Sequence, residues 1–230
     1  MGVTPLEPES SASASFATSA WATNDSAPPS RCQRLRARRV PYDARVAYRP
    51  PYVDPAFVMV DAPHPATLEE ADLLRQCEFT NGRVGGPGGQ HRNRVETAVF
   101  VVHRPSGIEA QATERRSQVE NRRNAVKRLR RRLASHVRTL VSRDVHECSA
   151  LWKRRRQGNK LTVNPDHEDY PGLLAEALDL VVARRYDVAG AAALLGITMS
   201  QLSRLIHHDK GAFAKLNTGR EACGLPPLRK

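Results

Sequence analysis

The sequence lacks several features that define whole classes of protein. It has no run of about 18 apolar residues, which excludes a transmembrane helix, and its N-terminus has no compact hydrophobic region after positive residues, which argues against a secretory signal. Its four cysteines, Cys32, Cys77, Cys148 and Cys223, form no C-x-x-C pair, so their spacing indicates neither a disulfide framework nor a zinc site. We expect a cytoplasmic protein without metal or cofactor.

Charge is concentrated in one part of the chain. The 230 residues include 36 Lys and Arg against 24 Asp and Glu, a formal charge of +12. Residues 1–103 have 11 basic and 11 acidic side chains, and residues 161–230 have 8 of each. Residues 104–160 have 17 basic and 5 acidic side chains and therefore hold the whole excess. A local block this basic indicates contact with a polyanion, either nucleic acid or an anionic membrane surface.

The first 58 residues have a composition typical of disorder. They are rich in Ser, Ala and Pro and show no sustained helical or strand period. Such a segment buries too little apolar surface to offset the entropy of ordering, so residues 1–58 are expected to be a disordered leader. A translation start at Met59 is an alternative.

Residues 62–140 have the pattern of a small folded domain. Thr67 followed by Glu70 predicts a capping box and a short helix over residues 68–75. A strand is expected over residues 77–83. The loop that follows, residues 82–90, contains five glycines and a proline, which suit no regular element.

A hairpin and a long helix complete this domain in the prediction. The β-branched and aromatic run at residues 97–102, the Pro105-Ser106-Gly107 turn and residues 108–113 predict two antiparallel strands. Ser117 with Glu120 predicts a second capping box. It opens a helix to about Leu140, with Val126, Leu129 and Leu133 as its apolar stripe.

The C-terminal part has a different pattern. Residues 141–164 are expected to be a basic linker in which Trp152 is a packing anchor, and residues 165–230 a helical unit with an amphipathic helix over residues 173–183. Within that unit, Ala192, Gly196, Leu202 and Leu205 have helix-turn-helix spacing: the small Ala allows close crossing, Gly196 takes the positive φ of the turn, and the leucines pack the second helix. Exposed positions are expected at Ser200, Gln201, Ser203 and Arg204. The overall prediction is an α+β fold: a short sheet packed by a long basic helix, followed by an all-α unit.

The glycine-rich loop does not fit the common nucleotide-binding motifs. Gln90 and His91 stand where a P-loop needs Lys and Ser or Thr, and no long parallel β-α-β unit surrounds the loop. Gly88 and Gly89 allow the backbone to approach another surface closely. Gln90 offers a backbone N–H and a side-chain amide to a developing oxyanion. With no Ser-His or Cys-His pair nearby, the nucleophile in such a site would be water.

Residues 82–129 resemble the GGQ domain of class I peptide chain release factors without a gap. Gly85 and Pro87 depart from the usual Ser and Ala but keep the loop small. The positions that match are Arg83, Gly86, Gly88, Gly89, Gln90, His91, Asn93, Arg94, Ala98, Val99, His103, Pro105, Gly107, Ile108, Arg116, Ser117, Gln118, Asn121 and Ala125.

This resemblance implies hydrolysis of the ester of peptidyl-tRNA in the peptidyl-transferase centre of the large ribosomal subunit. Gly88, Gly89 and Gln90 would be catalytic, and Gln90 a candidate for N5-methylation by a glutamine methyltransferase. Codon-reading members resemble this domain plus a stop-codon domain, for which residues 1–87 leave no room. The chain is therefore similar to codon-independent homologues that rescue ribosomes, and is expected to act as a monomer.

On this interpretation the basic block contacts ribosomal RNA, and a membrane partner is not needed. The expected residues for rRNA or tRNA contact are Arg83, His91, Arg92, Asn93, Arg94, Arg116, Gln118, Asn121, Arg122, Arg123, Lys127, Arg130, Arg131, Lys153, Arg154, Arg155 and Arg156. The long helix is also expected to expose Arg128, Arg132 and Arg138. The alternative function is a non-catalytic RNA- or DNA-binding regulator that uses the basic helix and the helix-turn-helix.

Overall fold

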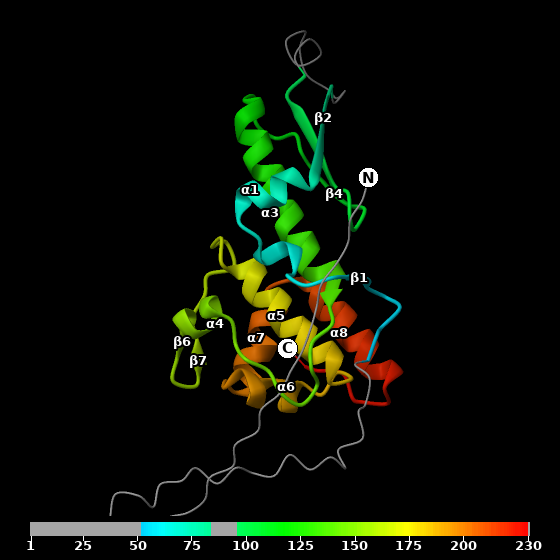
Figure 1. Ribbon diagram of the computed structural model, residues 1–230, viewed down its shortest axis with the longest axis vertical. Coiled ribbons are helices and arrows are strands. Elements are labelled where there is room, and N and C mark those ends of the chain that lie inside the picture. The colour runs from blue at the N-terminus through cyan, green and yellow to red at the C-terminus, as the bar shows by residue number, and fades with distance from the viewer. Residues whose placement is uncertain (1–51, 84–95, 230) are drawn as a thin grey trace, which may run out of the picture. The chain divides into compact units, whose positions relative to one another are not determined.

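A computed structural model describes residues 52–83 and 96–229, which belong to one unit that spans residues 48–230. The three-stranded sheet and the long helix α3 (Gln118–His136) come before a C-terminal part made of helices, which confirms the α+β class (Figure 1). In chain order they are β1 Val58–Val60, the 3-10 helix η2 Pro65–Thr67, α1 Glu70–Arg75, β2 Cys77–Gly82, β3 Ala98–His103, β4 Ile108–Ala112, α3 Gln118–His136, β5 Val137–Thr139, α4 Ala150–Arg155, β6 Arg156–Gln157, β7 Lys160–Leu161, α5 Tyr170–Ala183, α6 Val188–Leu195, α7 Met199–His207 and α8 Lys210–Ala222.

The predicted hairpin is confirmed as part of a three-stranded antiparallel sheet, with β3 between β2 and β4. Val99 and Val101 alternate along β3 and are almost fully buried. β3 and β4 pack against α3, as a strand with one buried face requires. The turn between them has Gly107 at φ 66°, a conformation that glycine adopts without strain.

The long helix α3 begins as predicted, because the Ser117 side chain caps it by accepting from the Glu120 amide. Its buried stripe includes Val126, Leu129 and Leu133. It ends at His136 rather than near Leu140. The chain then continues as β5, whose residues pair in parallel with β1, since β-branched side chains favour an extended backbone where they find a partner strand.

The short helix before the sheet differs from the prediction. Thr67 lies in η2, and its hydroxyl donates to the His64 carbonyl oxygen at 2.7 Å instead of capping a helix. α1 begins only at Glu70, after Glu69, whose side chain makes no capping bond. Its buried anchor is Leu73.

Residues 141–164, which the sequence predicts to be a basic linker, contain regular secondary structure and two buried anchors, Trp152 and Leu161. They contain α4 and the β6–β7 hairpin. Trp152 on α4 is fully buried, and its indole N–H donates to the Leu195 carbonyl oxygen at 3.0 Å. The packing role predicted for Trp152 is thereby confirmed, and the same packing fixes the segment against α6.

The C-terminal helices surround α5. Thirteen of its fourteen residues are buried, because α3, α4, α6 and α7 all contact it. It begins at Tyr170 and is a central helix rather than the amphipathic one expected over residues 173–183. α3 extends from the sheet to these helices, so the two parts share one core (Figure 1).

The predicted helix-turn-helix is present. α6 and α7 meet at a bend of 102°, and Gly196 between them has φ 65°. A β-carbon at Gly196 would also collide with the Arg156 side chain. Ala192, Leu202 and Leu205 are buried as expected. A further helix, α8, capped by Asp209, has no counterpart in the prediction.

The end of the expected leader belongs to the folded unit. Phe57 is buried under the Arg138 guanidinium, 4.8 Å from the ring centre. The Asp54 carboxylate, also buried, accepts a hydrogen bond from the Tyr186 hydroxyl. Residues 52–58 are therefore ordered, because their side chains find partners in the folded unit. Residues 1–51 lie outside the described part of the chain.

In the ranges that the structure describes, no single helix is long and apolar enough to cross a membrane. The α6–α7 pair meets the length and composition only across its sharp bend.

Candidate functional site

The β2 and β3 ends hold the base of the glycine-rich segment. Gly82, the last residue of β2, pairs with Ala98, the first of β3. Just beyond this pair, the Arg83 Nε lies 3.1 Å from a Glu96 carboxylate oxygen. Both side chains are more than half exposed, so the ion pair adds little stability, but it joins the two chain segments that lead into and out of residues 84–95.

The catalytic residues expected from the sequence lie outside the described residues. These are Gly88, Gly89 and Gln90, and the same holds for the expected RNA contacts His91, Arg92, Asn93 and Arg94. The structure describes the residues on either side of that segment, β2 and β3, and the helix α3 that packs against the sheet. These elements are called the scaffold below.

Asn121 is the main internal tether of this scaffold. Its side chain is fully buried. Its amide nitrogen donates to the Thr97 carbonyl oxygen at 2.6 Å and to the Arg115 carbonyl oxygen at 2.8 Å, while its amide oxygen accepts from the Arg115 N–H at 2.9 Å. One side chain thus ties the start of β3 to the start of α3. The expectation that Asn121 contacts RNA is wrong, because burial leaves no surface for a ligand.

His103 is likewise a structural residue. It is buried, with Nδ1 2.7 Å from the Ser106 hydroxyl and Nε2 2.9 Å from the Gln76 amide oxygen. Burial lowers its pKa below the ordinary value of 6.5. Both ring nitrogens are occupied, so the histidine fixes the β3–β4 turn to the chain before β2 and is not free to act as a base.

The basic face of α3 is less uniform than its sequence indicates. Arg122 lies over the Phe79 ring at 3.6 Å, a cation–π contact that leaves the guanidinium exposed. Arg128 pairs with Glu114, and Arg131 pairs with Asp166 at 2.9 Å. Acidic partners are scarce within the helix itself, yet the fold supplies them from the end of the sheet and from the segment before α5.

Other cations of this helix remain on the surface. Arg123 and Lys127 are exposed, and no ion pair joins either of them to another of the described residues. Arg116 and Gln118 are exposed just before and at the start of α3. Arg130 is half-buried and reaches toward the Ala66 carbonyl oxygen at 3.5 Å.

Arg138 is not part of this face, contrary to the prediction that it lies on the helix surface. It stands on β5, is 1% exposed, and pairs with Asp179 of α5 at 3.0 Å. Because α3 ends at His136, the chain direction changes before Arg138 and points its side chain into the core.

The basic run on α4 is paired within the protein. Lys153 lies 2.9 Å from a Glu147 carboxylate oxygen. Arg154 and Arg155 both contact the Asp169 carboxylate, at 3.1 and 2.6 Å. Burial opposes ionisation of Asp169, but these two arginines outweigh it and lower the pKa of the carboxyl. Arg156 donates to the Leu195 carbonyl oxygen at 3.3 Å. Among these cations, Arg155 is half-buried, whereas Lys153 and Arg154 are exposed and their pairs add little stability.

Residues 72–163, from within α1 to just after β7, match the family model of the RF-1 domain. This segment, which contains residues 82–129, is called the RF-1 domain below. The match runs through α4 and the β6–β7 hairpin, which agrees with their ordered packing, and ends before α5.

The curated relatives are similar to part of this chain. Peptide chain release factor 1 of Caldicellulosiruptor bescii is 40% identical over 78 residues, which cover 34% of this chain and 21% of that protein. The same factor of Chlorobaculum tepidum is 55% identical over 66 residues, 29% of this chain and 17% of that protein. The "Peptide chain release factor 1-like, mitochondrial" of Rattus norvegicus is 38% identical over 73 residues, 32% and 20% of the two chains. The chain spans about a fifth of the length of these relatives.

Some features of the RF-1 domain could not be found from the sequence. The tether by Asn121 depends on contacts to residues six and 24 positions away. The sequence did contain one signal for this tether. Asn121 is a polar residue four positions after the capping Ser117, on the side of the helix that faces the sheet. The cluster of His146, Cys148 and Glu176 had no sequence signal beyond the H-x-C spacing of its first two members.

Proposed function

We propose that this chain hydrolyses the ester bond of peptidyl-tRNA in the peptidyl-transferase centre of the large ribosomal subunit, without reading a codon. The observation that carries the proposal is an intact Gly88-Gly89-Gln90 triplet within an RF-1 domain. The Gln90 backbone N–H would stabilise the tetrahedral oxyanion, its side chain would admit water, and the glycines would permit close approach to rRNA.

Codon independence is proposed from the arrangement of the described residues beside the RF-1 domain. Before it, β1 pairs with β5 and η2 packs on α3; after it, α5 to α8 pack on the same helix core. These flanking elements are compact extensions of the RF-1 domain. The C-terminal unit, residues 165–230, is proposed to dock the protein on a ribosomal or protein surface, while residues 62–140 perform the hydrolysis.

The rRNA contacts are proposed for cations that face solvent. Exposed Arg116, Arg122, Arg123 and Lys127 lie on or just before α3, the helix to which Asn121 ties the start of β3. A polyanion bound by these cations would contact the helix that Asn121 ties to the start of β3. Arginine and lysine contacts to phosphate release counterions and make binding depend steeply on salt.

The deciding experiment is peptide release from stalled ribosomes and from free large subunits carrying peptidyl-tRNA. We expect the wild type to release peptide on at least one of these substrates regardless of the codon in the decoding site, and Gly89→Ala to lose release while binding is retained. Release that requires a stop codon would contradict codon independence. Absence of release by a wild type that still binds both substrates would contradict the proposed hydrolysis.

The role of α3 has its own test. Arg123→Ala with Lys127→Ala removes two exposed cations, and we expect the slope of log K against log salt to become shallower by about 1 for each phosphate that is no longer neutralised. Arg128→Ala is the matched control, because Arg128 already pairs with Glu114. A slope unchanged in the double variant contradicts phosphate binding at these positions.

A second candidate function is an RNA- or DNA-binding regulator, and the C-terminal geometry favours it. α7 stands beside the β6–β7 hairpin, and a groove of about 350 Å³ lies between them. Its polar lining includes Lys160, Gln201, Arg204 and His208, and Leu161, Val163 and Leu205 form its apolar part. A helix-turn-helix flanked by a hairpin can present such side chains to a nucleic acid backbone. We expect Arg204→Ala to weaken binding to the preferred nucleic acid and Lys210→Ala, outside the groove, to leave it unchanged.

The two candidates are separable. A regulator shows no peptide release even as the wild type, and its Gly89→Ala variant binds nucleic acid equally well. A hydrolase releases peptide as the wild type, and its Gly89→Ala variant loses release but keeps binding. The further partners we propose are a glutamine methyltransferase, detectable as one added methyl group on the Gln90 peptide of native protein, and the ribosome as the site of action in the cytoplasm. We propose a monomer, which sedimentation tests.

A further inference from the structure

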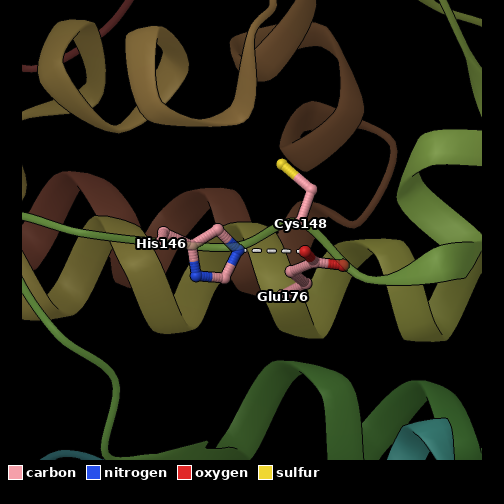
Figure 2. A group of neighbouring side chains, drawn as sticks. All are labelled: His146, Cys148 and Glu176. Atoms are coloured by element: carbon pink, nitrogen blue, oxygen red, sulfur yellow. Dashed lines mark hydrogen bonds and ion pairs between the residues drawn. The ribbon is translucent and has the colours of Figure 1, made fainter. Parts of the chain in front are cut away.

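Three side chains with metal-binding chemistry meet where the chain after β5 passes α5. His146 and Cys148 stand on the chain between β5 and α4, and Glu176 stands on α5 (Figure 2). The imidazole nitrogen, the thiol sulfur and a carboxylate oxygen all lie within 4.8 Å of one another. All three side chains are half-buried, so the cluster is shielded yet accessible to a small ion or a water molecule.

Glu176 is held in place and ionised. One of its oxygens accepts from the Ser149 N–H at 2.9 Å and lies 3.0 Å from His146 Nε2; the other accepts from the Ser149 hydroxyl at 2.6 Å. Burial raises the pKa of the carboxyl, but the His146 and Ser149 hydrogen bonds outweigh it, so the net shift is downward. Hydrogen bonds of this kind from a neighbouring residue orient a carboxylate for a metal.

Cys148 lacks a strong hydrogen-bond partner among the described residues. Its sulfur lies 3.8 Å from the Leu194 carbonyl oxygen and 4.0 Å from that of Leu195, which are long contacts for a weak donor. Burial, followed by the charge of Glu176, raises the pKa of its thiol. A cation at this point would reverse that effect, because a coordinating thiol is deprotonated by the metal.

We propose that His146, Cys148 and Glu176 bind a zinc ion. Nitrogen, sulfur and oxygen donors of these types are those that Zn²⁺ takes in proteins, usually in a tetrahedron. Zn–N and Zn–S bonds of about 2.0 and 2.3 Å place donor atoms roughly 3.5 Å apart. That separation lies within the 4.8 Å that bounds the cluster and is slightly wider than the 3.0 Å between His146 Nε2 and the Glu176 oxygen. His146 takes the tautomer with its proton on Nδ1, so that Nε2 exchanges its hydrogen bond to Glu176 for the metal. Cys148 releases its proton to solvent, and water takes the fourth position.

The site would link the chain that follows β5 to α5. None of its ligands is among the residues proposed for hydrolysis. Its role is therefore structural: it would hold the entrance to α4, and with it Trp152, against the C-terminal helices. The proposal stands independently of the proposed hydrolysis.

The test uses the full chain without an affinity tag and with Cys32→Ser and Cys223→Ser, so that Cys77, buried in the sheet core, and Cys148 are the remaining thiols. Cobalt(II) is titrated while the thiolate-to-cobalt charge-transfer absorption is followed, and zinc is then added to displace it. We expect one equivalent to bind, zinc to displace cobalt, and the melting temperature to rise with zinc.

The variants separate ligand from scaffold. Cys148→Ser should abolish the charge-transfer band, and Glu176→Gln should weaken zinc binding. Ser149→Ala should weaken it by about 10- to 100-fold, as loss of an orienting hydrogen bond does at other metal sites. Circular dichroism confirms that each variant is folded. No band in the parent protein, or a band that persists in folded Cys148→Ser, overturns the proposal.

Discussion

The buried pair of Arg138 and Asp179 offers a sharp test of how the RF-1 domain and the C-terminal helices are joined. Arg138 belongs to β5, inside the RF-1 match, and Asp179 to α5, beyond it. The two are 1% and 4% exposed and 3.0 Å apart. Arg138 also donates to the Ala134 carbonyl oxygen at 2.6 Å, and the Thr139 hydroxyl donates to the other Asp179 oxygen.

Replacing Asp179 with Ala leaves an uncompensated guanidinium in the core. Breaking a buried ion pair in this way costs about 3–5 kcal/mol, whereas replacing both partners with apolar side chains is often close to neutral. For a folded unit of this size each kcal/mol lowers the melting temperature by about 2–4 °C. We therefore expect Asp179→Ala to lower it by about 6–20 °C, and Arg138→Met with Asp179→Leu to recover most of that loss.

Thermal unfolding measures the change in melting temperature and urea unfolding the change in free energy, both followed by circular dichroism. Both variants should unfold in a single transition. Arg131→Ala is the control, because its pair with Asp166 is exposed and worth about 0–1 kcal/mol. The reasoning is refuted if Asp179→Ala costs no more than Arg131→Ala. It is also refuted if the double variant is as unstable as the sum of the two single ones, since the penalty would then not come from an unpaired charge.

Three further outcomes are expected. A chain that begins at Met59 lacks the buried ring of Phe57 and should be less stable by about 3–5 kcal/mol, measured by urea unfolding. Equal stability would show that residues 52–58 are not needed. Asn121→Ala leaves buried groups of two backbone segments without partners and should cost about 1–3 kcal/mol, while Gln118→Ala on the exposed face should not, by the same assay. Burial lowers the pKa of His64 and His103 below 6.5, so the unfolded chain binds more protons than the folded one below that pH. The free energy of unfolding should therefore be full above about pH 6.5 and fall as pH drops through the folded pKa values. His103→Gln should make the fall of the urea midpoint with pH less steep.

Local patterns in the sequence predicted the elements that local interactions make. The β3–β4 hairpin, the capping of α3 by Ser117 and the α6–Gly196–α7 turn all depend on residues within a few positions of each other, and all are present. The predicted capping box at Thr67 does not form, because the Thr67 hydroxyl donates to the His64 carbonyl oxygen instead. A capping motif is short, and a neighbouring backbone acceptor competes for the same side chain.

The placement of the charged side chains could not be predicted, for a different reason. Charged residues such as Arg138 and Lys153 to Arg156 usually lie on a protein surface. For most of them, however, the fold places an acidic group or a carbonyl oxygen beside the side chain, from a residue 14 to 41 positions away. Such partners are brought together by the packing of β5, α4 and β6 against the helical region that begins at Asp169, which no local pattern encodes. The fold also brings His146, Cys148 and Glu176 together. The spacing of the cysteines in the sequence does not predict this cluster.

The sequence by itself determined the α+β class, the RF-1 resemblance and the Gly88-Gly89-Gln90 triplet, because these depend on residue identity and short spacing. It also determined that the excess positive charge lies in residues 104–160. Only the tertiary structure decided which of those charges face solvent and which, like Arg138, are buried in pairs. A charge is counted from the sequence, but its free energy depends on burial and on the partner that the fold places beside it.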